Sequence, residues 1–209
     1  MEAAKSLRSC SLHFFHIFIF SFAILFLMSS IPTVSAKTSN SSCIKTYKSY
    51  IKTACKSATY QKDCYKSLSP YASTIKTDPE KLYKVTLYIT IRAARETSSS
   101  ISSLWRLKDL TPTERGIIRD CAETVSDAID ELKQSLTVMT NLRSSSDRRS
   151  EMENVRSWVS AALTDQSTCT DQFDGQTVSN AVNKNIKKTV LNLARMTSNC
   201  LALVDAVNY

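Results

Sequence analysis

The cysteines constrain what this chain can fold into more than any other feature. The sequence contains seven cysteines, of which Cys10 precedes a long apolar run. Cys55 and Cys64 lie close together in the sequence, whereas Cys121 and Cys169 are far apart. An even set of cysteines in an oxidising compartment normally forms disulfides. This spacing predicts two disulfides, each joining the two arms of an antiparallel helical hairpin.

Residues 1–36 have the pattern of a secretory signal peptide. Basic residues precede an apolar run from Leu12 to Met28, and a small-residue cleavage site ends at Ala36. We expect cleavage after Ala36, which removes Cys10 and leaves a mature chain of residues 37–209 without a membrane anchor. The alternative is an uncleaved signal anchor, because the apolar run is at the lower limit of membrane-spanning length.

Cleavage also removes both histidines of the chain, His13 and His16. A mature chain without histidine cannot form a Ser-His-Asp or Cys-His arrangement, and it lacks the most common metal ligand. The absence of histidine does not exclude catalysis by carboxylate or lysine side chains. We nevertheless expect a protein that is not an enzyme and that has no metal site and no cofactor.

The chain is basic, and loss of the signal peptide lowers its formal net charge only from +8 to +7. No nucleic-acid-binding module accompanies this charge, so we expect no nucleic-acid partner. In a secreted protein the charge favours either simple solubility or weak electrostatic association with a polyanionic matrix such as pectin in a plant cell wall. Asn40 begins an N-glycosylation sequon in the polar segment before the first expected helix.

Turn-forming residues are scarce, which argues against all-β folds. Glycine occurs only at Gly116 and Gly175, and no proline follows Pro112. Start signals and apolar stripes instead predict an all-α chain. We expect a short N-terminal helical hairpin over about 43–68 and an up-down-up-down four-helix bundle over about 79–207. The four expected bundle helices span about 79–105, 111–142, 150–173 and 177–207.

This helix order predicts which cysteines pair. Cys121 and Cys169 are equidistant from position 145 in the loop between two expected helices, so an antiparallel hairpin makes them neighbours. On one continuous helix Cys55 and Cys64 would be about 13 Å apart, so they must flank a turn to form a bridge. Cys200 lies on an apolar stripe, which favours a buried free thiol. A disulfide with Cys43 is the alternative, and no spacing argument supports it.

Several segments resemble the plant invertase inhibitor and pectin methylesterase inhibitor family. The resemblance rests on Thr53-Ala54-Cys55, Tyr60 to Cys64, Asp120 to Leu132, Trp158 to Thr164 with Thr168-Cys169, and Met196 to Asn199. It implies a four-helix bundle with an N-terminal hairpin and two disulfides. It also implies a secreted, apoplastic or cell-wall protein that inhibits a cell-wall enzyme by covering its substrate cleft.

The family has two classes of target, pectin methylesterases and acid invertases. Invertase inhibitors of the family carry a Pro-Lys-Phe segment before the last framework cysteine, and residues 144–168 of this chain contain no proline. We therefore expect a pectin methylesterase as the partner, with acid invertase as the alternative. A second alternative is a basic wall-associated helical protein that inhibits no enzyme.

An acidic stripe is the candidate surface for binding the partner. Glu123, Asp127 and Asp130 recur at helical spacing, and the expected Cys121–Cys169 bridge would bring Thr168 and Asp171 level with them. The corresponding positions are polar contact candidates in similar esterase inhibitors. The alternative is an ordinary solvated face of a bundle.

Overall fold

The structure is a computed structural model that describes the backbone of residues 36–206 and the side chains of residues 41–206. The expected signal peptide lies outside the described residues, apart from Ala36. By its internal contacts the chain divides into two units, residues 1–46 and residues 47–209. In the described part of the chain, no helix is both long and apolar enough to cross a membrane.

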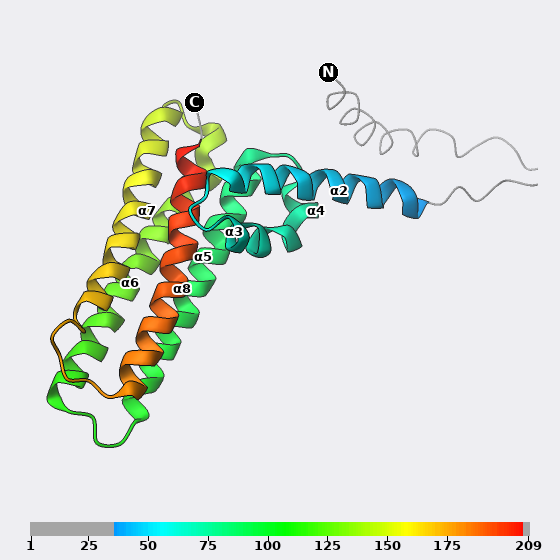
Figure 1. Cartoon of the computed structure of the whole chain (residues 1–209). Coiled ribbons are helices and arrows are strands. Elements are labelled where there is room, and N and C mark those ends of the chain that lie inside the picture. The colour runs from blue at the N-terminus through cyan, green and yellow to red at the C-terminus, as the bar shows by residue number, and fades with distance from the viewer. Residues whose placement is uncertain (1–35, 207–209) are drawn as a thin grey trace, which may run out of the picture. The chain divides into compact units, whose positions relative to one another are not determined.

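Four long helices of the second unit form the expected up-down-up-down bundle (Figure 1). Each helix packs against the next one in sequence, and the last packs against the first, which closes a four-sided bundle. The expected fold class, all-α with two disulfides, is therefore confirmed. The bundle helices are α5 (Pro79–Ser103), α6 (Pro112–Asn141), α7 (Arg148–Asp171) and α8 (Asn180–Asp205).

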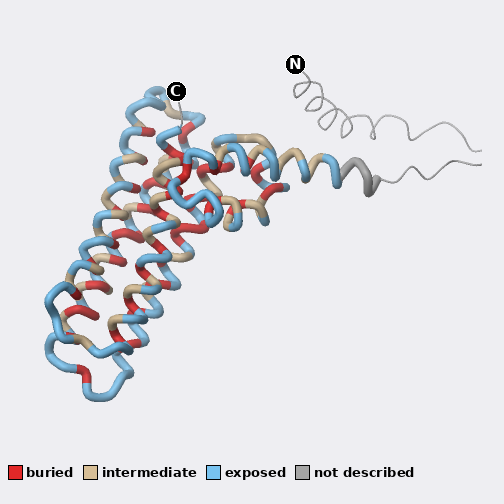
Figure 2. Tube along the Cα trace, viewed as in Figure 1, coloured by how far each residue is buried: buried red, intermediate tan, exposed pale blue. Residues whose placement is uncertain are grey.

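The buried residues line the inward faces of these helices (Figure 2). The apolar stripes expected on α6 and α7 are inside, including Val125, Leu132 and Val159. The apolar stripe expected on α5 is correct at Leu82, Ile89 and Ile101, which are buried, whereas Val85 and Ala93 are only partly buried and the core side also includes threonines. Thr86 and Thr90 donate their hydroxyls to the carbonyl oxygens of Leu82 and Thr86, at 2.8 and 2.9 Å. These internal bonds remove the cost of burying a polar group.

Side-chain caps fix the starts of the bundle helices. The capping box of Thr111 and Glu114 is present at the start of α6. The expected start of α7 at Ser150 was wrong, because Asp147 is the cap and its carboxylate accepts from the Ser150 N–H at 3.1 Å. Beyond α7, Gly175 has φ 71°, a left-handed conformation that costs glycine little.

The N-terminal hairpin consists of α2 (Ala36–Ala54) and α3 (Gln61–Leu68), with a short turn of 3-10 helix between them. Cys55 and Cys64 are bonded across this turn, with Cα atoms 5.8 Å apart. The backbone of Asn40 is helical, so the expectation that this sequon precedes the first helix was wrong. The Asn40 side chain lies outside the described residues.

The turn of the hairpin is attached to α8. The Asn199 amide accepts from the Tyr60 N–H at 2.9 Å and donates to the Tyr60 carbonyl oxygen at 3.0 Å. Asn199 is buried, and the neighbouring Cys200 is a buried free thiol, so no Cys43–Cys200 bridge forms. One further short helix that the sequence reading missed, α4 (Ala72–Ile75), connects the hairpin to α5.

Candidate partner-binding surface

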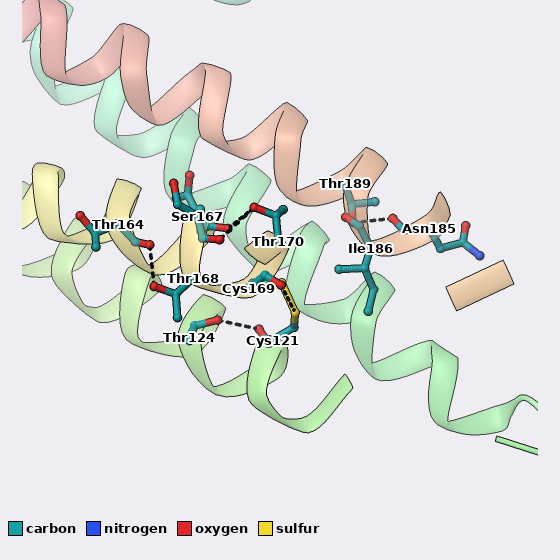
Figure 3. Close-up of a disulfide and its surroundings, with 11 residues drawn as sticks. Cys121, Thr124, Thr164, Ser167, Thr168, Cys169, Thr170, Asn185, Ile186 and Thr189 are labelled. Carbon is teal, nitrogen blue, oxygen red and sulfur yellow. Dashed lines mark hydrogen bonds between the residues drawn. A yellow bond between two sulfur atoms is a disulfide. The ribbon is translucent and has the colours of Figure 1, made fainter. Parts of the chain in front are cut away.

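The α6–α7 pair carries the candidate surface, and the Cys121–Cys169 disulfide fixes the register of this pair. The two Cα atoms are 4.6 Å apart, and both cysteines are fully buried. Figure 3 shows the bridge between the two helices, with Thr124 of α6 and Thr168 of α7 beside it. A crosslink at this point prevents one helix from sliding along the other.

All five residues of the expected surface are exposed. Glu123 follows Cys121 by two positions, while Thr168 and Asp171 flank Cys169, so the disulfide brings these three to the same level of the bundle. Asp127 and Asp130 lie about 6 and 10 Å further along α6. The surface is therefore an elongated stripe and not a single cluster.

Two members of this surface already have partners within the chain. Asp130 accepts a hydrogen bond from the Lys133 ammonium at 2.8 Å, in an exposed ion pair. The Thr168 hydroxyl donates to the Thr164 carbonyl oxygen at 3.0 Å (Figure 3). Exposed pairs of this kind contribute little to stability, so an incoming protein can replace them at low cost.

The sequence reading missed two carboxylates that belong to this surface, Glu131 of α6 and Asp165 of α7. Both are partly buried, and they interact with each other through a hydrogen bond between the two helices. The charge of Asp127 acts on both of them. Within the described residues, the buried atoms Glu131 Oε2 and Asp165 Oδ2 accept no hydrogen bond from a nitrogen or hydroxyl donor. The exposed acidic stripe therefore lies over a second acidic layer.

This arrangement changes the protonation of the pair. Burial, the neighbouring Asp165 and the charge of Asp127 raise the pKa of Glu131 to about 7. Burial also raises the pKa of Asp165, although the hydrogen bond from Glu131 opposes that rise. Glu131 is thus the protonated group, and its carboxylic O–H donates a hydrogen bond to the Asp165 carboxylate. At mildly acidic pH Glu131 is therefore neutral.

The symmetry of the hairpin alone does not predict this contact. The mirror about position 145 places Asp165 opposite residue 125, about 9 Å before Glu131 along α6. Side chains of a helix lean toward its N-terminus, and in an antiparallel pair the two carboxylates lean toward each other. Glu131 lies one helical turn beyond Asp127 on the same side of α6, and its lean brings it toward Asp165. This combination of spacing and lean could have identified the pair.

The groups on this surface are suited to binding a partner protein. Within residues 41–206, no group of histidine, cysteine, aspartate and glutamate side chains is arranged to hold a metal ion. Exposed carboxylates on a rigid helix pair can accept charge-assisted hydrogen bonds from arginine or lysine of a partner. Charge complementarity of this kind increases the rate and the specificity of association.

The sequence pattern of the plant invertase/pectin methylesterase inhibitor family matches residues 49–203. Pectinesterase inhibitor 11 of Arabidopsis thaliana is 35% identical over 193 residues, which cover 91% of this chain and 93% of that protein. A 21 kDa protein of Daucus carota is 37% identical over 158 residues, which cover 75% of this chain and 82% of its own. The similarity thus includes the bundle and most of the hairpin.

Solved structures agree with this similarity at the level of the fold. A mutant form of a pectin methylesterase inhibitor from Arabidopsis superimposes with a TM-score of 0.57 at 22% identity, covering 76% of this chain and 97% of that one. A second crystal structure of a pectin methylesterase inhibitor, from Arabidopsis thaliana, gives a TM-score of 0.50 at 21% identity. At this identity the likeness supports the helical fold alone.

Proposed function

Because the chain belongs to the plant invertase/pectin methylesterase inhibitor family, we propose that it is secreted to the apoplast and inhibits a plant pectin methylesterase there. It is an enzyme inhibitor and not an enzyme. The observation that carries the choice of target is the similarity to pectinesterase inhibitor 11, which covers 91% of this chain. Residues 144–168, which lack the Pro-Lys-Phe segment expected of invertase inhibitors, support the same choice.

In the proposed complex the α6–α7 surface binds beside the substrate cleft of the esterase and blocks entry of the polymer. Glu123, Asp127 and Asp130 supply carboxylates for basic groups of the enzyme, and Thr168 and Asp171 extend this surface onto α7. The Cys121–Cys169 bridge holds the two helices in register before binding, so little conformational freedom is lost in the complex. The proposed complex contains one inhibitor and one enzyme.

The target is tested by adding the purified protein to a plant pectin methylesterase and, separately, to a cell-wall invertase. We expect esterase activity to fall to its minimum at an equimolar ratio, while invertase activity stays unchanged. Inhibition of the invertase alone would assign the chain to the other class of target. Failure to inhibit either enzyme would support the non-inhibitory alternative.

The surface is tested by reversing two charges in the variant Asp127→Lys/Asp130→Lys. We expect inhibition to weaken by about tenfold or more, because attraction to basic groups becomes repulsion. The matched control is Asp63→Lys/Glu96→Lys, which makes the same change of net charge at exposed positions on α3 and α5. Equal losses in both variants, or no loss in either, would show that the acidic stripe is only a solvated face of the bundle.

The protonated Glu131–Asp165 pair gives the complex an expected pH dependence. We expect inhibition to weaken as pH rises from 5 to 8. Glu131 loses its proton near pH 7, and the repulsion that then acts between Glu131, Asp165 and Asp127 loosens the α6–α7 pair that carries the surface. Glu131→Gln stays neutral at every pH, so its inhibition should change less over this range. An unchanged inhibition constant of the original chain between pH 5 and 8 would reject this mechanism.

A further inference from the structure

A basic and aromatic groove lies between α5 and α6, on a different side of α6 from Glu131. It has a volume of about 430 Å³. Tyr88 is 55% exposed although its ring is large and apolar, and Ile91 and Leu136 also line the groove. The remaining lining residues are Arg92, Arg95, Lys133 and Thr137.

The groove has an excess of positive charge. Three of its lining side chains are cations, and no carboxylate lines it. Arg92 has an exposed partner, Glu96, at 3.6 Å, and Lys133 pairs with Asp130 at 2.8 Å. Among the described residues, Arg95 forms no ion pair. Exposed pairs are weak, so carboxylates of a ligand can compete for these cations.

The positions of these groups follow the helix axis. Tyr88, Arg92 and Arg95 follow one another at steps of four and three on α5, and the span from Tyr88 to Arg95 rises about 10 Å. Lys133 faces them from α6. A ligand that fits must therefore be elongated, must carry repeated negative charges, and must offer a flat face to the tyrosine ring.

We propose that this groove binds a linear polyuronate, an acidic polysaccharide whose sugar rings carry carboxylates. The arginines bind the carboxylates through paired hydrogen bonds, and the exposed face of Tyr88 packs against a sugar ring. An acidic peptide helix fits less well, because such helices bind through a continuous row of apolar anchors and this groove offers only Ile91 and Leu136 as its aliphatic side chains. The binding is additional to enzyme inhibition.

Calorimetric titration of the full mature chain with unesterified oligogalacturonate tests this proposal. We expect measurable binding that weakens as salt rises, because exposed charges are screened. The variant Arg92→Gln/Arg95→Gln should bind about tenfold more weakly, a loss typical of one or two charge-assisted hydrogen bonds. Tyr88→Ala should also weaken binding, whereas Tyr88→Phe, which keeps the ring, should not.

Three controls test whether this groove is the binding site and which ligand it binds. Lys184→Gln/Lys188→Gln removes the same charge from exposed positions on α8, so an equal loss of affinity there would overturn the groove as the site. Fully methyl-esterified oligogalacturonate should bind much more weakly, and equal binding would overturn the role of the carboxylates. Polyglutamate that binds as tightly as the sugar polymer would assign the groove to acidic peptides instead.

This outcome is separable from esterase inhibition. The side chains changed in the arginine variant lie on α5, whereas the proposed inhibitory carboxylates lie on α6 and α7. We therefore expect Arg92→Gln/Arg95→Gln to inhibit the esterase as the original chain does when a short, soluble ester substrate is used. Loss of both properties in this variant, with unchanged melting, would show that the groove belongs to the enzyme-binding surface.

Discussion

At the scale of single residues, Glu114 joins two segments of the bundle. Its carboxylate accepts from the Thr111 N–H at 2.8 Å at the start of α6, and from the Ser179 N–H at 2.9 Å at the start of α8. Glu114 is only 4% exposed, and these hydrogen bonds, led by those with Ser179, lower its pKa to about 2. One buried carboxylate therefore caps its own helix and connects it to the loop before α8.

We predict that Glu114→Gln destabilises the fold. Its folded-state pKa is depressed, so its contribution is present above about pH 4.5 and is lost as pH falls toward 2. At pH 6 the variant should lose about 1 to 3 kcal/mol of unfolding free energy, measured by urea denaturation. Near pH 2 the difference should shrink, and Glu123→Gln, an exposed change on the same helix, should have little effect at either pH.

At the scale of elements, the two disulfides hold their helices over very different lengths of chain. Cys121 and Cys169 are separated by 48 residues, and Cys55 and Cys64 by nine. A crosslink that closes a longer loop removes more freedom from the unfolded chain in the entropy model. The α6–α7 bridge should therefore contribute more to stability than the hairpin bridge.

We predict that Cys121→Ala/Cys169→Ala lowers the free energy of unfolding by about 4 kcal/mol, and Cys55→Ala/Cys64→Ala by about 3 kcal/mol. Chemical denaturation of both variants and of the original chain measures the difference. A larger loss from the hairpin bridge would show that strain or residual structure in the unfolded chain outweighs the length of the loop.

A second element-scale prediction concerns the attachment of the hairpin to α8. Asn199→Ala removes both hydrogen bonds to the Tyr60 backbone. We expect faster amide hydrogen exchange in residues 55–64 and a loss of about 1 to 2 kcal/mol in global stability. Ser198→Ala is the control, because Ser198 lies next to Asn199 and donates a long, exposed hydrogen bond of 3.4 Å to the Thr59 hydroxyl. Unchanged exchange in Asn199→Ala would show that packing alone holds the hairpin.

At the scale of the whole molecule, two carboxylates with opposite pKa shifts determine how stability depends on pH. Glu114 stabilises the fold above about pH 4.5, and this contribution disappears toward pH 2. The pKa of Glu131 is raised to about 7, so its contribution is complete below about pH 4.5 and is lost as pH rises through 7. Together they favour the folded state most in the mildly acidic range.

We predict a maximum of the melting temperature between about pH 4 and 6. Glu131→Gln should abolish much of the fall between pH 5 and 8, and at pH 8 it should be more stable than the original chain by about 1 to 3 kcal/mol. Melting curves followed by circular dichroism from pH 3 to 8 measure both effects. A profile that keeps rising to pH 8 would contradict the assignment of the proton to Glu131.

Much of the fold could be predicted from the sequence, because its determinants are local or symmetric. The capping box at Thr111 lies within four residues, and the α6 and α7 stripes follow the helical period. The pairing of Cys121 with Cys169 follows from their equal distance from one turn. The core face of α5 could be predicted only in part, because Thr86 and Thr90 count as polar until their bonds to the preceding turn are known.

The four bundle helices, the cysteine pairing and the exposed positions of the acidic stripe follow from patterns in the sequence. Which side chains of different helices meet follows only from the packing of the folded chain. Glu131 contacts Asp165, and Tyr88 and Arg95 share a groove with Lys133, because the side chains lean along helices whose rotation depends on the whole core. The helical period and the symmetry of the hairpin predict how far along the bundle a residue lies and on which face of its helix. The packing of neighbouring helices determines which residue of another helix it contacts.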